Sequence, residues 1–205
     1  MMNGKTIVIS MLLAFSLIAA GCGASSTATT RVAADTQTDL SGRWNDTDSR
    51  LVAEQMVSDL LSAGWLPNFV DENGAKPRVI VGKVRLKDSM EHIKTSGFIK
   101  DIERELVNSG RVSFVASASE RDIVRDERMD QQSFASEESA KRLANEAAAD
   151  YMLSGSITMY VDAVGGKQAK FYQIDMELIN IESNEKVWLG SKEIKKIVQQ
   201  RKASW

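Results

Sequence analysis

The sequence predicts an α+β protein with a single folded domain, in which a mixed or antiparallel sheet of about four to five strands packs against helices. Segments with helical periodicity alternate with segments rich in Val and Ile from about residue 40 onward, which is typical of one mixed core. The last third of the chain holds three strand-like segments, so we expect the sheet to end in a three-stranded meander. Of the 205 residues, 43% are hydrophobic and 26% charged, which suits one globular domain over residues 40–197 and a basic tail over 198–205.

Helix-start and helix-stop residues bound four helical segments. Residues 45–47 (Asn-Asp-Thr) favour an N-cap, and Gly64 ends the first apolar stripe. Ser119 is expected to cap the third helix, and Ser136 followed by two Glu begins the fourth. The predicted helices span residues 48–63, 95–108, 120–132 and 136 to about 147.

The strand segments are rich in β-branched residues and are separated by turn sequences. Residues 64–77, which contain Trp65 and Pro67, are expected to form a loop ahead of the first strand. Gaps at 162–169, which includes Gly165-Gly166, and at 183–186 have hairpin character. The predicted strands span residues 78–86, 112–116, 151–161, 170–182 and 187–195.

The N-terminus has the organisation of an export signal over residues 1–21. Lys5 precedes an uncharged apolar stretch over residues 6–20, which is shorter than the roughly 20 residues that a membrane-spanning helix needs. The Ala-Ala-Gly-Cys sequence that follows resembles the lipobox of bacterial lipoproteins, which implies cleavage between Gly21 and Cys22 and lipid attachment to Cys22. A free thiol after an ordinary secretory signal is the alternative.

A tether is expected between the lipid and the domain, over residues 22–39. This stretch is dominated by Ala, Ser, Thr, Gly, Asp and Gln and lacks a helical or strand period, so it cannot bury enough apolar surface to order itself. Seventeen residues span at most roughly 60 Å when fully extended. The domain must therefore stay near the membrane that holds Cys22.

The composition argues against nucleic-acid binding, an internal disulfide, a zinc site and enzymatic activity. Lys and Arg number 26 against 28 Asp and Glu, so the basic excess typical of nucleic-acid binders is missing and we expect no nucleic-acid partner. With one His and one Cys, the chain cannot form an internal disulfide or an ordinary zinc site. We therefore expect no metal, no cofactor and no enzymatic activity.

The candidate catalytic groups each have a simpler structural explanation. His92 stands alone in a loop and is more typical of a surface or capping residue. Asp175 and Glu177 lie two apart on one strand and project from the same face, where solvent accounts for them as well as a glycosidase pair does. The charged segment 120–130 has acids and bases at helical spacing, which a solvated helix satisfies by itself.

Arg43 and Trp44 are the candidate partner-binding residues. Trp44 lies in a polar run before the first helix, where it is either an exposed interface anchor or a hydrophobic staple that folds back onto the domain. Trp188 stands between Val187 and Leu189, which are expected to face inward, and a covering helix would make Trp188 part of the core.

Four sequence blocks resemble one known family. They are residues 39–50 (DLSGRWNDTDSR), 98–106 (FIKDIEREL), 171–182 (FYQIDMELINIE) and 184–188 (NEKVW), and they closely resemble LpoB-type lipoproteins, which activate penicillin-binding proteins. The resemblance covers about residues 39–197. It implies a domain similar to the N-terminal domain of TolB that docks on a non-catalytic domain of a bifunctional (class A) peptidoglycan synthase and raises its activity.

The resemblance also implies a location: the outer membrane, on its periplasmic side. The lipid is expected to be the only membrane contact, because the mature chain is weakly acidic and would not adhere by itself to an anionic leaflet. Gly23 follows the Cys, in place of the Asp that resembles an inner-membrane retention signal. We expect a monomer. The tether is shorter than that of the better-known members, which is a departure from the family pattern. A structural secretion-pore component of the curli-export lipoprotein type is the alternative function, although the long amphipathic hairpins that a pore would need are not evident.

Overall fold

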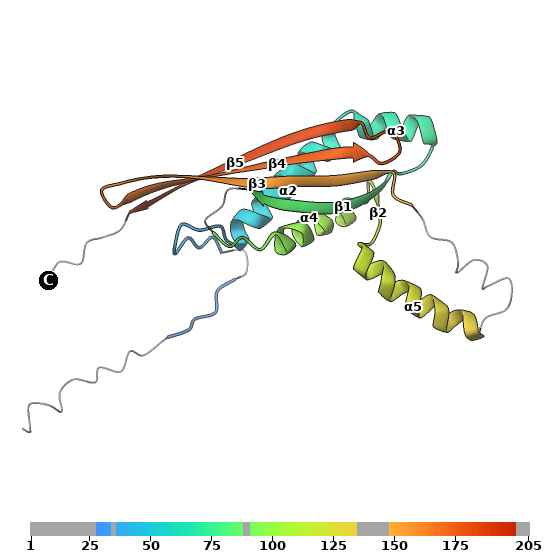
Figure 1. Ribbon diagram of the computed structural model, residues 1–205, viewed down its shortest axis with the longest axis horizontal. Helices are drawn as coiled ribbons and strands as arrows, with labels where there is room; N and C mark the ends of the chain where they lie inside the picture. The colour runs from blue at the N-terminus through green and yellow to red at the C-terminus, as the bar shows by residue number, and fades with distance from the viewer. Residues whose placement is uncertain (1–27, 34–35, 88–90, 135–147, 200–205) are drawn as a thin grey trace, which may run out of the picture. The chain divides into compact units, whose positions relative to one another are not determined.

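A computed structural model describes residues 28–33, 36–87, 91–134 and 148–199, of which the side chains of residues 130–134 are excepted (Figure 1). The described helices and strands all belong to one compact unit, Gln37–Trp205, and the described residues of the unit Met1–Thr36 carry neither helix nor strand. The predicted signal peptide, the predicted helix 136–147 and the tail beyond residue 199 lie outside the described residues.

Four helices are described: α2 (Asp46–Ser62), α3 (Trp65–Asn73), α4 (Thr95–Ser109) and α5 (Ala118–Phe134). Helix α2 starts at a capping box, in which the Asn45 side chain accepts a hydrogen bond from the amide of Asp48 at 3.0 Å and the Asp48 carboxylate accepts one from the amide of Asn45 at 2.9 Å. This reciprocal cap satisfies two amide donors that a helix start otherwise leaves free.

Helix α3 corrects the loop predicted for this region. Pro67 lies in its first turn, where a missing amide hydrogen costs nothing, and Gly74 ends it in the left-handed conformation at φ 62°. Trp65 and Leu66 are buried, and the Trp65 ring packs edge-on against Tyr151 at 5.2 Å. A helix of two turns depends on this tertiary contact more than on its own propensity.

Helix α5 begins at Ala118, two residues before the predicted start at residue 120. Ser117 donates from its amide and its hydroxyl to the Glu120 carboxylate, at 2.9 and 2.7 Å, so Ser117 occupies the place expected for Ser119. Lys100 of α4 lies 2.6 Å from the other oxygen of Glu120 and ties the start of α5 to α4.

Five strands form one mixed sheet in the order β2-β1-β3-β4-β5. Strand β1 pairs in parallel with β2 and β3, whereas β3, β4 and β5 pair antiparallel and form the predicted meander. The α+β fold class is thus confirmed. Strand β2 is only two residues long, shorter than predicted, while β3 and β4 meet directly at the two-residue turn Gly165-Gly166. The strands are β1 (Arg78–Lys87), β2 (Ser113–Phe114), β3 (Tyr151–Val164), β4 (Lys167–Asn180) and β5 (Lys186–Gln199).

Helices α2 and α4 cover one face of the sheet (Figure 1). The core lies between them, and its members on the sheet are alternate residues, including Leu153, Ile157, Ile174 and Leu178, all at most 2% exposed. The opposite face, here called the open face, carries no described helix. It contains Leu189, which is 68% exposed, so the inward orientation expected for this residue is wrong. Trp188 instead faces the helices and packs on the core, with its ring over Gly190.

Candidate partner-binding site

Arg43 and Trp44 lie where the chain enters α2, in a segment that the sheet holds in place. The Trp44 side chain is half-buried and packs edge-on against Tyr172 of β4 and Phe98 of α4, with ring centroids 5.7 and 6.0 Å apart. It thus folds back onto the domain, but its contacts are long-range rather than the i+5 staple contact with Ser49. Arg43 is exposed, and its guanidinium forms no ion pair with any described residue.

Two networks fix this segment, and we call them together the clasp; their side chains are largely buried except that of Asp39, which is 46% exposed. In the first, the Lys196 ammonium near the end of β5 lies 2.6 Å from carboxylate oxygens of both Asp39 and Asp48 and donates to the carbonyl of Arg43 at 3.1 Å. Burial lowers the pKa of Lys196, but its two carboxylate hydrogen bonds outweigh burial, so the pKa is raised above its ordinary value.

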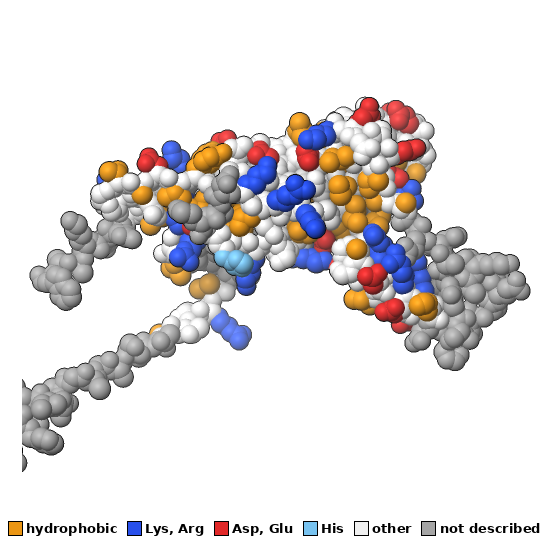
Figure 2. Space-filling view, viewed as in Figure 1, with side chains coloured by type: hydrophobic (Ala, Val, Ile, Leu, Met, Phe, Trp, Pro, Cys, Tyr) orange, Lys and Arg blue, Asp and Glu red, His pale blue; other side chains and the backbone are white. Residues whose placement is uncertain are grey.

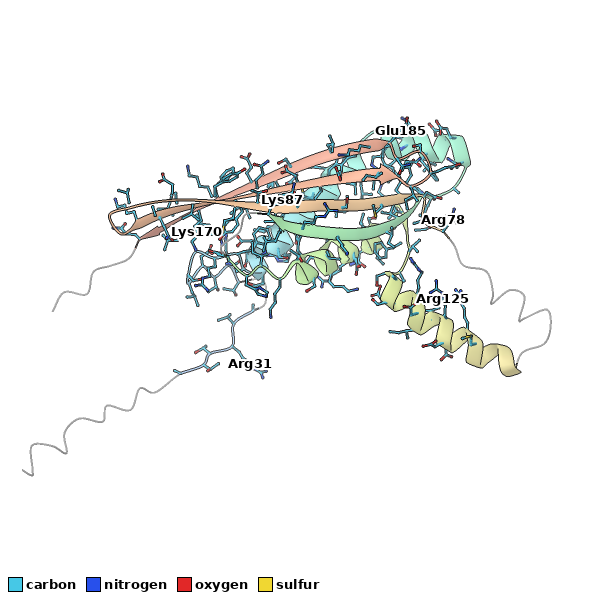
Figure 3. All side chains as sticks on the ribbon, in the orientation of Figure 1. Arg31, Arg78, Lys87, Arg125, Lys170 and Glu185 are labelled. Carbon is cyan, nitrogen blue, oxygen red and sulfur yellow. The ribbon has the colours of Figure 1, made fainter. Side chains whose placement is uncertain are left out.

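The second network centres on Glu91, whose side chain is 10% exposed. The Glu91 carboxylate pairs with Lys170, accepts a hydrogen bond from the Tyr172 hydroxyl at 2.8 Å and accepts the Trp44 amide at 3.4 Å. Burial raises the pKa of Glu91, and the hydrogen bonds from Lys170 and Tyr172 overcome it and lower the pKa. Burial and the adjacent carboxylate raise the pKa of Tyr172. Figure 3 shows Lys170 at the end of the sheet where the N-terminal segment meets it.

The clasp positions main chain rather than performing chemistry. Glu91 has the ammonium of Lys170 to itself, whereas Asp39 and Asp48 share that of Lys196, so each carboxylate of the clasp has a positive neighbour. Gly42 has φ 63°, and a Cβ at this position would come within 2.2 Å of the Val198 side chain, so the chain passes very close to β5. The result is a rigid platform from which the exposed Arg43 side chain projects.

The remaining sequence candidates do not join this site. His92 is exposed, and Asp175 and Glu177 lie on the open face, where Asp175 accepts a hydrogen bond from Ser191 at 2.8 Å and Glu177 pairs with Lys186 at 2.6 Å. The charged segment 120–130 is part of α5. Cys22 and Gly21 lie outside the described residues.

Sequence reasoning missed the residues that build the clasp: Glu91, Lys170, Tyr172 and Lys196. One feature of the sequence could have indicated them. Lys170 and Lys196 fall at strand positions whose side chains point toward the helices, and a basic side chain at such a covered position requires an acidic partner. The sequence could not identify that partner, since Lys196 and Asp48 are 148 residues apart.

We also searched the described residues for metal-binding clusters and for membrane-spanning helices. None of their His, Cys, Asp and Glu side chains gather in groups of three or more that could hold a metal ion. No helix among them is long and apolar enough to cross a membrane.

A mixed sheet with helices on one face and a polar clasp at one end defines a small α+β domain. The chain matches the family model for the peptidoglycan-synthase activator LpoB over residues 48–194, and it belongs to this family. The resemblance inferred from the sequence blocks is therefore confirmed. The family is one of activators rather than enzymes, which favours the activator function over the secretion-pore alternative.

Solved structures that match the chain include two LpoB domains. The LpoB C-terminal domain from Salmonella enterica is 20% identical, with 75% of this chain and 99% of that chain covered and a TM-score of 0.40. The LpoB C-terminal domain from Escherichia coli is 18% identical, with 73% and 99% covered and a TM-score of 0.44. Lipoprotein GNA1162 from Neisseria meningitidis is 12% identical, with 63% and 88% covered and a TM-score of 0.40. No curated protein sequence matches the chain.

Proposed function

We propose that this protein is a lipid-anchored envelope regulator that binds and activates a bifunctional class A penicillin-binding protein. The observation that carries the proposal is the family match over residues 48–194, which covers nearly the whole folded unit. The chain itself performs no reaction in this proposal. Activation requires that the regulator bind the active state of the synthase more tightly than the inactive state, because equal affinity for both states would shift nothing.

Arg43 is the proposed contact residue, and Trp44 supports it. A guanidinium that is exposed and unpaired among the described residues is available to a carboxylate of the partner. The clasp on either side holds the backbone of Arg43 through Lys196 and that of Trp44 through Glu91, so little conformational entropy is lost on binding. The exposed part of the half-buried Trp44 ring extends the contact.

The proposed anchor is the lipidated Cys22, in the outer membrane and facing the periplasm. The residues from 23 up to the clasped Asp39 act as the tether in this proposal, which limits the reach of the domain to roughly 60 Å. The partner's docking domain must therefore extend to within this distance of the anchoring membrane. Because the short tether keeps the regulator close to its membrane, contact between the two proteins depends on how far the partner extends toward that membrane.

Purified components test the activation. We expect the mature protein to capture a class A synthase from the same cell and to raise its rate of glycan polymerisation. The Arg43→Glu variant should weaken both effects at least tenfold, whereas Lys76→Glu, the same charge change at an exposed site ahead of β1, should leave them unchanged. An unaltered polymerisation rate with every class A synthase of the cell would refute the activator proposal.

A separate variant tests the anchor. The Cys22→Ala change should leave an unprocessed chain that carries no acyl chains, detected by mass spectrometry and by the failure of metabolic labelling with a fatty-acid analogue. Equal labelling of Cys22→Ala and the unaltered chain would contradict lipid attachment at Cys22 without bearing on synthase activation.

A further inference from the structure

The open face of the sheet contains a groove of about 790 Å³ that none of the preceding roles uses. It crosses β1, β3, β4 and β5, and its rim includes Leu189, which is 68% exposed. We propose that this face binds a second copy of the same chain, so that two sheets stack face to face around a two-fold axis. The proposal is independent of the synthase partner and replaces the monomer expected from the sequence.

The charge pattern across the groove points to this occupant. Strand β1 presents three exposed bases, Lys83, Arg85 and Lys87, and none of them pairs with a described acid. Figure 2 shows Lys and Arg side chains gathered midway along the sheet, and Figure 3 places Lys87 on β1. Two strands away, Asp175 of β4 accepts hydrogen bonds only from uncharged groups of described residues, Ser191 and Gln173. Opposite charges thus stand on the two sides of the groove without compensation.

The strand register aligns these charges. Arg85 pairs with Ser156 of β3, and Ser156 pairs with Asp175, so the three residues form one row across the sheet. Neighbouring strands are about 4.8 Å apart, which places Arg85 and Asp175 at equal distances of about 5 Å on either side of β3. The hydroxyl of Ser156 between them leaves the middle of the row uncharged.

A two-fold axis that lies along β3, between two stacked sheets, exchanges the two sides of this row. Such an axis places Arg85 of each copy over Asp175 of the other, which creates two ion pairs at once. Stacked sheets are separated by about 10 Å, a gap that a long Arg and a short Asp can bridge together. A face with basic side chains alone would fit an acidic partner. A face with bases on one side of its central strand and an acid on the other is complementary to a second copy of itself.

The size of the face is compatible with a weak dimer. Four strands are about 19 Å wide and nine residues of strand about 30 Å long, which gives a flat area on the order of 600 Å². Standard interfaces bury about 800 Å² of accessible surface on each partner. Because exposed ion pairs are screened by salt, we expect an association that weakens strongly as ionic strength rises.

Light scattering coupled to size-exclusion chromatography tests the dimer on the full chain in detergent, with the mass of protein separated from that of the micelle. The unaltered chain should show twice its protein mass at about 0.05 M salt, and its dissociation constant should rise at least tenfold by about 0.5 M. Arg85→Glu and Asp175→Arg should each give the single mass. The double variant R85E/D175R restores both ion pairs with reversed polarity and should return to twice the mass.

Lys94→Glu, the same charge change as in R85E but between β1 and α4 and away from the open face, is the matched control and should remain dimeric. Melting temperatures of all variants within a few degrees of the unaltered chain would confirm that each one folds. A single mass for the unaltered chain at low salt would overturn the proposal. Twice the mass for R85E would also overturn it, because the two copies would then associate through another face or through the micelle.

Discussion

The Lys196 ammonium, three residues from the end of the last described strand, lies 2.6 Å from a carboxylate oxygen of Asp48 in the first turn of α2. Both side chains are 9% exposed. The pair closes the clasp, since Asp48 also caps α2 and Lys196 also holds Asp39. It therefore couples the start of the folded domain to its end.

Replacing Lys196 with Met should lower the free energy of unfolding by about 3 kcal/mol, because it leaves the buried Asp48 carboxylate without its counter-charge. Urea denaturation measures the loss, and amide hydrogen exchange should show faster opening at residues 39–48. The neighbouring Lys195 is exposed, so Lys195→Met should change stability by less than about 0.5 kcal/mol. Equal effects of the two substitutions would contradict the role of Lys196.

Glu91 should make stability depend on pH in the acidic range. Its pKa is lowered in the folded state, so its contribution is complete above the ordinary value of 4.5 and is lost as the pH falls through the folded-state pKa. The difference in free energy of unfolding between the unaltered chain and Glu91→Gln should be largest at neutral pH and shrink below about pH 4.5. A difference that stays constant from pH 7 to pH 3 would show that the charge of Glu91 contributes nothing.

Substitutions of Arg43 and Trp44 should differ in their effect on the free energy of unfolding. Trp44→Ala removes ring contacts with Phe98 and Tyr172 from a half-buried side chain and should cost about 2 kcal/mol. Arg43→Ala removes an exposed side chain and should change stability by less than about 0.5 kcal/mol. Thermal or urea unfolding checks both. A destabilisation by Arg43→Ala as large as that by Trp44→Ala would mean that Arg43 is structural and not free to bind a partner.

Two glycine substitutions should have opposite signs. A Cβ on Gly155 would lie 2.3 Å from the Asp175 carbonyl oxygen and 2.4 Å from the Met176 sulfur, so Gly155→Ala should destabilise by at least about 2 kcal/mol. Gly97 lies in α4 with nothing within 4 Å of such a Cβ, and Gly97→Ala should stabilise by up to about 1 kcal/mol. Melting temperatures of the two variants test both predictions. A Gly155→Ala variant that melts at the same temperature as the unaltered chain would show that β3 and β4 can separate locally.

Local sequence patterns were sufficient for most elements. Alternation in β4 separated the covered residues Tyr172 and Ile174 from Gln173 and Asp175, because side chains on a strand point to opposite faces in turn. The N-cap preference of residues 45–47 placed the start of α2 within two residues. Helix α3 was missed because its nine residues are stabilised by packing on Tyr151, which lies 86 positions beyond Trp65 in the sequence.

The sequence by itself determined the fold class, the meander and the family, since each depends on periodicity, composition or contiguous blocks, and it predicts the anchor at Cys22. Only the tertiary structure decided which strand of the sheet each element meets, that Trp44 packs inward, and that Lys196 reaches Asp48. The physical reason is that ion pairs and ring contacts act through space over a few ångströms. Residues far apart along the chain make them only after the sheet has set the register.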